Sequence, residues 1–154
     1  MPEKETLEKA RKDLREGKSP STAAGEFVHE EIEHVREGKH GARSPQQAIA
    51  IGLSKARRAG IPLKPPRRGS STAATRKSAA RDSQRGRSSP GGNPSPRRSR
   101  ATEGALKRER RSSASHSALS RQAHRAADRR SRASRSGAAR KAASTRRAHR
   151  RSPR

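Results

Sequence analysis

Residues 44–60 read SPQQAIAIGLSKARRAG, and this stretch carries the clearest fold signal in the chain. Ser44 is a typical N-cap residue, and the proline after it is typical of the first helical position. Gln47, three residues after Ser44, completes the pattern of a capping box. Apolar residues recur at helical spacing, and a glycine closes the stretch. The pattern predicts a helix over residues 45–59. Gly52 inside it favours the close approach of a second helix, because glycine has no side chain.

The same signals recur upstream of this helix. Residues 3–16 carry leucine and alanine at helical spacing, with glutamates near the start and basic residues near the end, which suits the helix dipole. Ser19 then stands before another proline and predicts a helix over residues 20–37. Gly17 and Gly38 are predicted to end these two helices. The front of the chain is therefore predicted to be a three-helix module.

Large apolar side chains are confined to the front of the chain. Residues 1–66 hold twelve Val, Ile, Leu, Met or Phe residues, and the rest of the chain holds two. So few large apolar groups cannot offset the backbone entropy lost on folding, about 1–2 kcal/mol per residue. We therefore expect a helical module over residues 1–63 and a disordered Arg/Ser/Ala-rich tail over 64–154, with a nascent helix at 114–134. The expected fold class is small all-α, with about three short helices followed by a long intrinsically disordered basic tail.

The charge of the chain is as unevenly distributed as its apolar content. Residues 67–154 hold 24 arginines and 3 lysines against 4 acidic residues, which is +23 of the total formal charge of +26. A polycation of this density attracts a dense polyanion, and nucleic acid is the commonest one in a cell. The aromatic content is a single Phe27, so the aromatic platform on which single-stranded bases stack is missing. The composition therefore favours a duplex binder that contacts the phosphate backbone.

Three segments of the front, GEFV at 25–28, REGKHGARS at 36–44 and QAIAIGLSKARRAG at 47–60, carry a resemblance to a known group. Over about residues 15–63 the chain resembles a family of small uncharacterised bacterial proteins with a domain of unknown function. Some members are labelled plasmid-stabilisation or DNA-binding proteins. The resemblance carries little information on function, because the family has no established catalytic residues to transfer. The tail resembles bacterial histone-H1-like tails by composition, although it is rich in Arg and Ser where those tails are rich in Lys, Ala and Pro.

Basic residues around the predicted third helix are the candidate contacts in the front module. A glycine-bearing basic loop that leads into a helix N-terminus favours a phosphate, because free N–H groups and the helix dipole attract an anion. The candidate nucleic-acid contacts there are Lys39, His40, Arg43, Ser44, Lys55, Arg57 and Arg58. In the tail, the candidate contacts are the clustered arginines Arg67, Arg68, Arg97, Arg98, Arg100, Arg110, Arg111, Arg129, Arg130, Arg146, Arg147, Arg150 and Arg151.

The histidines and glutamates of residues 29–34 raise a metal hypothesis, since His29/Glu33 and Glu30/His34 are pairs four residues apart on a predicted helix. The spacing departs from the zinc-protease pattern, which needs a histidine where Glu33 stands. We interpret the segment as a solvated helix face with favourable His–Glu pairs. No metal site, cofactor or catalytic residue is predicted. The chain has no cysteine, and a disordered tail cannot hold reacting groups in place, so an enzyme is not expected.

These observations favour sequence-independent binding of nucleic acid, foremost duplex DNA, in the manner of a nucleoid or histone-like factor. If about ten basic residues contact phosphates, the logarithm of the binding constant falls with the logarithm of salt concentration at a slope of about −9. The alternative is an adaptor, in which the helical front docks a protein partner or a second copy and the tail localises it to DNA or RNA. The expected location is the cytoplasm, on the nucleoid, with no membrane association.

Overall fold

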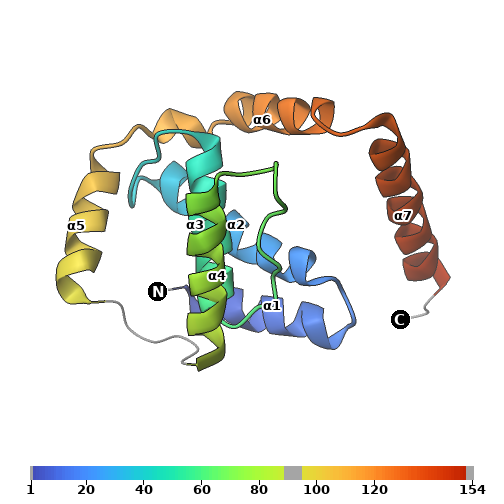
Figure 1. The fold of residues 1–154 in the computed structure, drawn as a ribbon, viewed down its shortest axis with the longest axis horizontal. Helices are drawn as coiled ribbons and strands as arrows, with labels where there is room; N and C mark the ends of the chain where they lie inside the picture. Colours follow the sequence, from blue (N-terminus) through green and yellow to red (C-terminus); the bar gives the residue numbers. More distant parts are fainter. Residues whose placement is uncertain (1, 89–94, 152–154) are drawn as a thin grey trace. The chain divides into compact units, whose positions relative to one another are not determined.

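The computed structural model describes residues 2–88 and 95–151, and these divide into two compact units. The N-terminal unit is Met1–Ala118 and the C-terminal unit is Leu119–Arg154. The described residues form seven α-helices and one short 3₁₀ helix (Figure 1). In chain order these are α1 (Lys4–Arg15), α2 (Pro20–Glu37), α3 (Pro45–Arg58), α4 (Ala73–Ser88), α5 (Pro96–Lys107), η1 (Arg111–Ala114), α6 (His116–Asp128) and α7 (Arg132–Arg151).

The first three helices begin and end within a residue of the positions that the sequence predicts, 3–16, 20–37 and 45–59. The Ser19 hydroxyl accepts a hydrogen bond from the Thr22 N–H, and the Ser44 hydroxyl accepts one from the Gln47 N–H, both at 3.3 Å. Gly38 ends α2 with a φ of 80°, the left-handed conformation that favours glycine. The predicted serine caps and glycine stops are therefore confirmed. The capping box is formed only in part, because the Gln47 side chain accepts from the Arg43 N–H, at 2.7 Å, and not from the Ser44 N–H.

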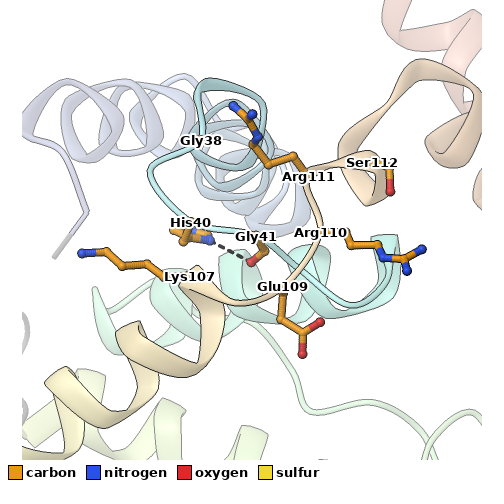
Figure 2. A pocket seen from close by; sticks show the side chains of 8 residues that line it. All are labelled: Gly38, His40, Gly41, Lys107, Glu109, Arg110, Arg111 and Ser112. Atoms are coloured by element: carbon orange, nitrogen blue, oxygen red, sulfur yellow. Dashed lines mark hydrogen bonds between the residues drawn. The ribbon is translucent and has the colours of Figure 1, made fainter.

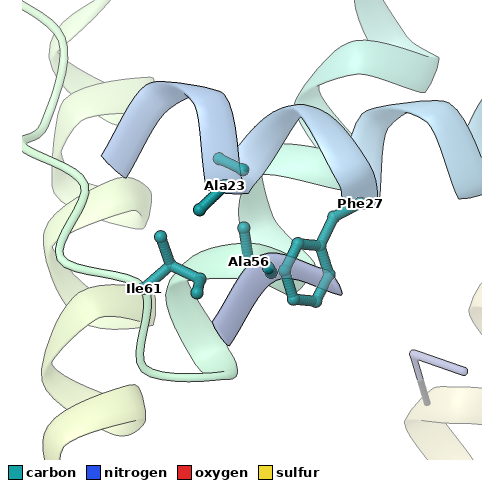
Figure 3. Close-up of a cluster of buried hydrophobic side chains, with 6 residues drawn as sticks. Ala23, Phe27, Ala56 and Ile61 are labelled. Carbon is teal, nitrogen blue, oxygen red and sulfur yellow. The ribbon is translucent and has the colours of Figure 1, made fainter. Parts of the chain in front are cut away.

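Alanine supplies most of the buried apolar residues of the N-terminal unit. In the larger cluster, Phe27 of α2 packs with Ala23, Ala56 and Ile61 (Figure 3), and Ala10 and Ala24 complete the buried cluster. A second cluster gathers Val35, Ala42, Ala48 and Ala114. Because alanine projects only a methyl group, helices that pack through it bring their backbones close together.

Gly52 marks the closest approach of α2 and α3. A Cβ at this position would lie 2.7 Å from the Val28 Cα and 2.9 Å from the Phe27 carbonyl oxygen, both of which are backbone atoms of α2. The predicted use of this glycine, close contact with another helix, is confirmed. The contact fixes how deeply α3 sits against α2, and α1 packs on the same helix (Figure 1).

The prediction of a disordered tail is wrong, because the chain beyond residue 63 is helical and part of it packs on the first three helices. α4 lies along α3 (Figure 1) and buries Ala79 and Gly86. Across this contact the Ser54 hydroxyl donates to Asp82 at 2.5 Å. η1 packs on α2 and α3, and Arg36 Nε donates to the Ala114 carbonyl oxygen at 3.0 Å. Residues 89–94 and 152–154 lie outside the described residues.

Disorder was expected because only large apolar side chains were counted, and that count leaves out alanine and glycine. The buried residues of α4 and η1 are Ala79, Gly86, Ser113 and Ala114. Serine also stabilises these helices as an N-cap, since the hydroxyls of Ser115 and Ser131 accept hydrogen bonds from backbone N–H groups at the starts of α6 and α7. Alanine and arginine are strong helix formers, so capped Ala/Arg runs become helices without a large core. The description of this region as intrinsically disordered falls with that prediction, while its compositional likeness to histone-H1-like tails stays a prediction.

Substituting Gly52 by Ala should destabilise the protein by about 1–3 kcal/mol, although alanine is the better helix former, because the added methyl group meets the backbone of α2. Gly25→Ala is the matched control, since nothing lies within 4 Å of its Cβ and the site is exposed on α2. We expect the control to stabilise by about 0.5–1 kcal/mol. Urea unfolding followed by circular dichroism measures both variants. Equal effects of the two substitutions would contradict close packing at Gly52.

Candidate functional site

The loop between α2 and α3, residues 38–44, is covered by the segment that follows α5. The N–H groups of Gly41 and Ala42 donate to the carbonyl oxygens of Leu106 and Arg110, at 2.9 and 3.1 Å. These bonds join residues more than sixty positions apart, and both donors are buried. The two amides therefore already have acceptors from the protein and are not free for a phosphate.

A cavity of about 440 Å³ lies where this loop meets the segment after α5 (Figure 2). Three cationic side chains, Lys107, Arg110 and Arg111, line it together with His40, against a single acid, Glu109. Figure 2 shows Arg111 reaching over Gly38, while the side chains of Lys107 and Arg110 point away from one another. The remaining lining residues are Gly38, Gly41 and Ser112. His40 of the predicted front contacts and Arg110 and Arg111 of the predicted tail contacts thus meet at one cavity whose charge suits an anion.

A buried ionic cluster lies beneath the same loop. Glu31 of α2 is fully buried, and its Oε2 lies 2.7 Å from the Lys55 Nζ of α3. Lys55 also donates to Glu30 Oε1 at 3.2 Å, and His40 Nε2 lies 3.1 Å from Glu31 Oε1. The Lys55 side chain is only 17% exposed. Of the predicted nucleic-acid contacts, Lys55 is therefore committed to two carboxylates of its own chain.

Glu3 joins this cluster to the start of the chain. Its carboxylate accepts from His34 Nε2 at 2.9 Å and from Lys39 Nζ at 3.3 Å, and its N–H donates to Glu30 Oε2 at 3.1 Å. The hydrogen bond from His34, followed by the one from Lys39, lowers the pKa of Glu3 below 4.5. The contribution of ionised Glu3 to stability is therefore complete above pH 4.5 and is lost as the pH falls through the lower pKa of the folded state.

The remaining predicted nucleic-acid contacts of the front differ in their exposure and in their ion pairs. Arg43 is exposed, and Lys39 is half exposed but pairs with Glu37 at 3.1 Å as well as with Glu3. Arg57 is buried, and that burial lowers the pKa of its guanidinium, which stays charged at neutral pH. Arg58 lies 3.8 Å from Asp82 at the contact with α4, and Ser44 caps α3.

The predicted tail contacts lie along the later helices and are exposed wherever their side chains are described. Arg67 and Arg68 precede α4, and Arg97, Arg98 and Arg100 lie on α5. Arg129 and Arg130 follow α6, and the last four lie on α7. These are Arg146 and Arg147, which are exposed, and Arg150 and Arg151, whose side chains are outside the described residues.

Sequence reasoning missed Glu31. The sequence of residues 29–34 predicts a solvated face for it, but Phe27, Glu31 and Val35 are four residues apart and lie on one buried stripe of α2. The spacing to Phe27 and Val35 was the signal that could have revealed its burial. No local sequence signal predicts that His40 lies beside Glu31, because this contact depends on how the loop at residues 38–44 folds against α2.

Comparison with protein-family models, with curated proteins and with solved structures finds no match to this chain. The resemblance to the bacterial family over residues 15–63 therefore stays a prediction. Among the helices that the structure describes, none combines the length and the apolar character needed to cross a bilayer.

Replacing Lys55 by Met should destabilise the protein by about 3–5 kcal/mol, because the buried carboxylates of Glu30 and Glu31 lose their ammonium partner. Lys9→Met is the control, since it removes a lysine from an exposed pair with Glu5 and should cost no more than about 1 kcal/mol. Denaturant unfolding measures both. A Lys55 variant as stable as the Lys9 variant would show that the buried cluster contributes nothing to the fold.

Proposed function

We propose that this protein binds double-stranded nucleic acid without regard to sequence, through the exposed arginines of the C-terminal unit. The observation that carries the proposal is the distribution of ion pairs. Every ion pair among the described residues lies between positions 3 and 107. Residues 119–154 hold thirteen basic residues and a single acid, Asp128. The field of these cations is therefore not compensated within their own unit.

The geometry of α7 supports contact with a phosphate backbone. The helix is 20 residues long, about 30 Å, and its sequence holds eight basic residues and no acid. At 3.6 residues per turn, Arg135, Arg140, Arg146 and Arg147 fall within an arc of about 140°. We call these four residues the arginine face. Because duplex DNA carries one charge per about 1.7 Å of axis, a helix lying against it meets phosphates along its whole length.

The chemistry of the chain supports backbone contact over base recognition. Phe27 is the only aromatic residue of the Phe, Tyr and Trp class, and it is fully buried in the core, where no base can stack on it. The other residues of α7 are alanine, serine, glycine, threonine and one histidine, which offer few groups for reading base edges. Association with the nucleoid would follow from such binding.

Replacing the arginine face by glutamine tests the proposal. In the full-length protein, the plot of log binding constant against log salt should flatten by about 3–4 units, because each lost phosphate contact removes about 0.9. The control replaces Lys4, Arg11, Arg15 and Lys64 by glutamine, which removes the same charge from exposed positions without ion pairs. Fluorescence anisotropy of a labelled duplex DNA across a salt series measures both slopes.

An equal loss of slope in the two variants would mean that net charge alone governs binding and that the arginine face is not the contact surface. Unrelated duplexes should bind the parent protein equally well, and a strong preference for one sequence would overturn the proposal. Tighter binding to single-stranded than to double-stranded probes at matched salt would also overturn it.

A further inference from the structure

The carboxylate of Glu31 is short of hydrogen bonds although two cationic or ionisable groups lie beside it. Both oxygens are sealed from solvent, and neither has a hydrogen bond of acceptable geometry. The contacts at 2.7 Å to Lys55 and at 3.1 Å to His40 are close enough for strong attraction, but their angles are poor. The distances set the electrostatic attraction, and the missing hydrogen bonds show that at least one lone pair of Glu31 is aimed elsewhere.

His40 is held in an orientation that suits a metal ligand. Its Nδ1 lies 3.0 Å from the Gly41 carbonyl oxygen, which can only accept, so the proton of the neutral ring is on Nδ1. Nε2 then presents a lone pair 3.1 Å from Glu31 Oε1 without pointing at it. Two atoms bound to one tetrahedral zinc ion at 2.0–2.2 Å lie about 3.3 Å apart and point at the ion, not at each other. The separation and the misalignment are both those of two ligands of one ion.

His34 lies close enough to Glu31 and His40 to supply a third ligand. The ligand atoms of Glu31, His34 and His40 all lie within 4.8 Å of one another, and the two imidazole rings meet edge to face with centroids 6.2 Å apart. The His34 and His40 side chains are 13% and 14% exposed. Nε2 of His34 donates to the Glu3 carboxylate, which leaves Nδ1 with the lone pair. A carboxylate that orients a histidine in this way is a regular feature of metal sites.

An acidic cleft gives a cation access to His34. The cleft, of about 140 Å³, contains His34 in its wall and is lined by six glutamates against two lysines. The glutamates are Glu3, Glu5, Glu26, Glu30, Glu33 and Glu37. In a chain whose formal net charge is +26, this is a local concentration of negative charge that draws cations inward.

We propose that Glu31, His34 and His40 bind a divalent transition-metal ion, with Zn²⁺ as the ion whose ligand preference they match. Two imidazoles and one carboxylate suit zinc, whereas Ca²⁺ and Mg²⁺ take sets of oxygen ligands. Glu31 binds through Oε1 while Oε2 stays with Lys55. The ion ties the loop at residues 38–44 to α2. His29, which entered the metal hypothesis drawn from the sequence, is exposed and lines the acidic cleft, and it does not belong to the three-ligand group.

Zinc titration of chelator-treated, full-length protein tests the proposal. Calorimetry should show one tight site per chain, and His34→Ala and His40→Ala should each weaken it by at least tenfold. His116→Ala is the control, because it removes an exposed histidine that lies outside both the three-ligand group and the acidic cleft, and it should leave the affinity unchanged. Loss of binding in His116→Ala equal to that in His34→Ala would overturn the site, as would absence of a tight site in the parent protein.

Two further measurements keep a failure to fold from being mistaken for a lost ligand. Circular dichroism of each variant before titration checks that the helices are intact, and Glu31→Gln, which keeps the shape of the side chain, should also weaken zinc by at least tenfold. Co²⁺ provides a spectroscopic probe, because its visible absorption intensifies when it is bound tetrahedrally. A weak octahedral spectrum in the folded parent protein would contradict the proposed site, whatever the outcome of the nucleic-acid experiments.

Discussion

The N-terminal unit depends on close contact between helix backbones at positions that carry little or no side chain. Gly52 lies against the backbone of α2, and a Cβ on Gly86 would overlap the carbonyl oxygen of Arg57 at the end of α3. A Cβ on Gly41 would overlap the carbonyl oxygen of Glu109 in the same way. These three glycines fix α3 on α2, α4 on α3, and the segment after α5 on the loop before α3. With mostly alanine between the helices, dispersion between backbone atoms takes the place of interlocking large side chains.

This kind of core explains which parts of the fold could be predicted from the sequence. Local signals were sufficient for the first three helices, because the caps at Ser19 and Ser44 and the stop at Gly38 act within a few residues. They were not sufficient for α4 and η1, whose attachment depends on Ala79, Gly86 and Ala114 finding matching surfaces far away in the chain. A buried alanine cannot be distinguished from an exposed one in the sequence, whereas a run of large aliphatic residues indicates a core.

The candidate site shows the same division between local and distant information. The burial of Glu31 could be predicted, because it is four residues from both Phe27 and Val35 on α2. Its environment could not, because Lys55 comes from α3 and His40 from a loop whose amides bond to residues beyond position 105. A glutamate in an apolar stripe is costly to bury unless other groups compensate it. The partners of Glu31 are therefore a consequence of the tertiary fold, and the small residues around the loop make room for them.

Charge has two different uses in this chain, and salt separates them. In the N-terminal unit most carboxylates pair with cations, and the pairs that involve Glu31 are shielded from water, so mobile ions screen them weakly. Among residues 119–147, the cations whose side chains the structure describes are exposed and unpaired with carboxylates, so their attraction for a polyanion is fully open to screening. Salt that releases nucleic acid from the arginine face should therefore leave the buried cluster intact. The fold is held by contacts that salt hardly reaches, while the proposed binding surface consists of charges that it reaches first.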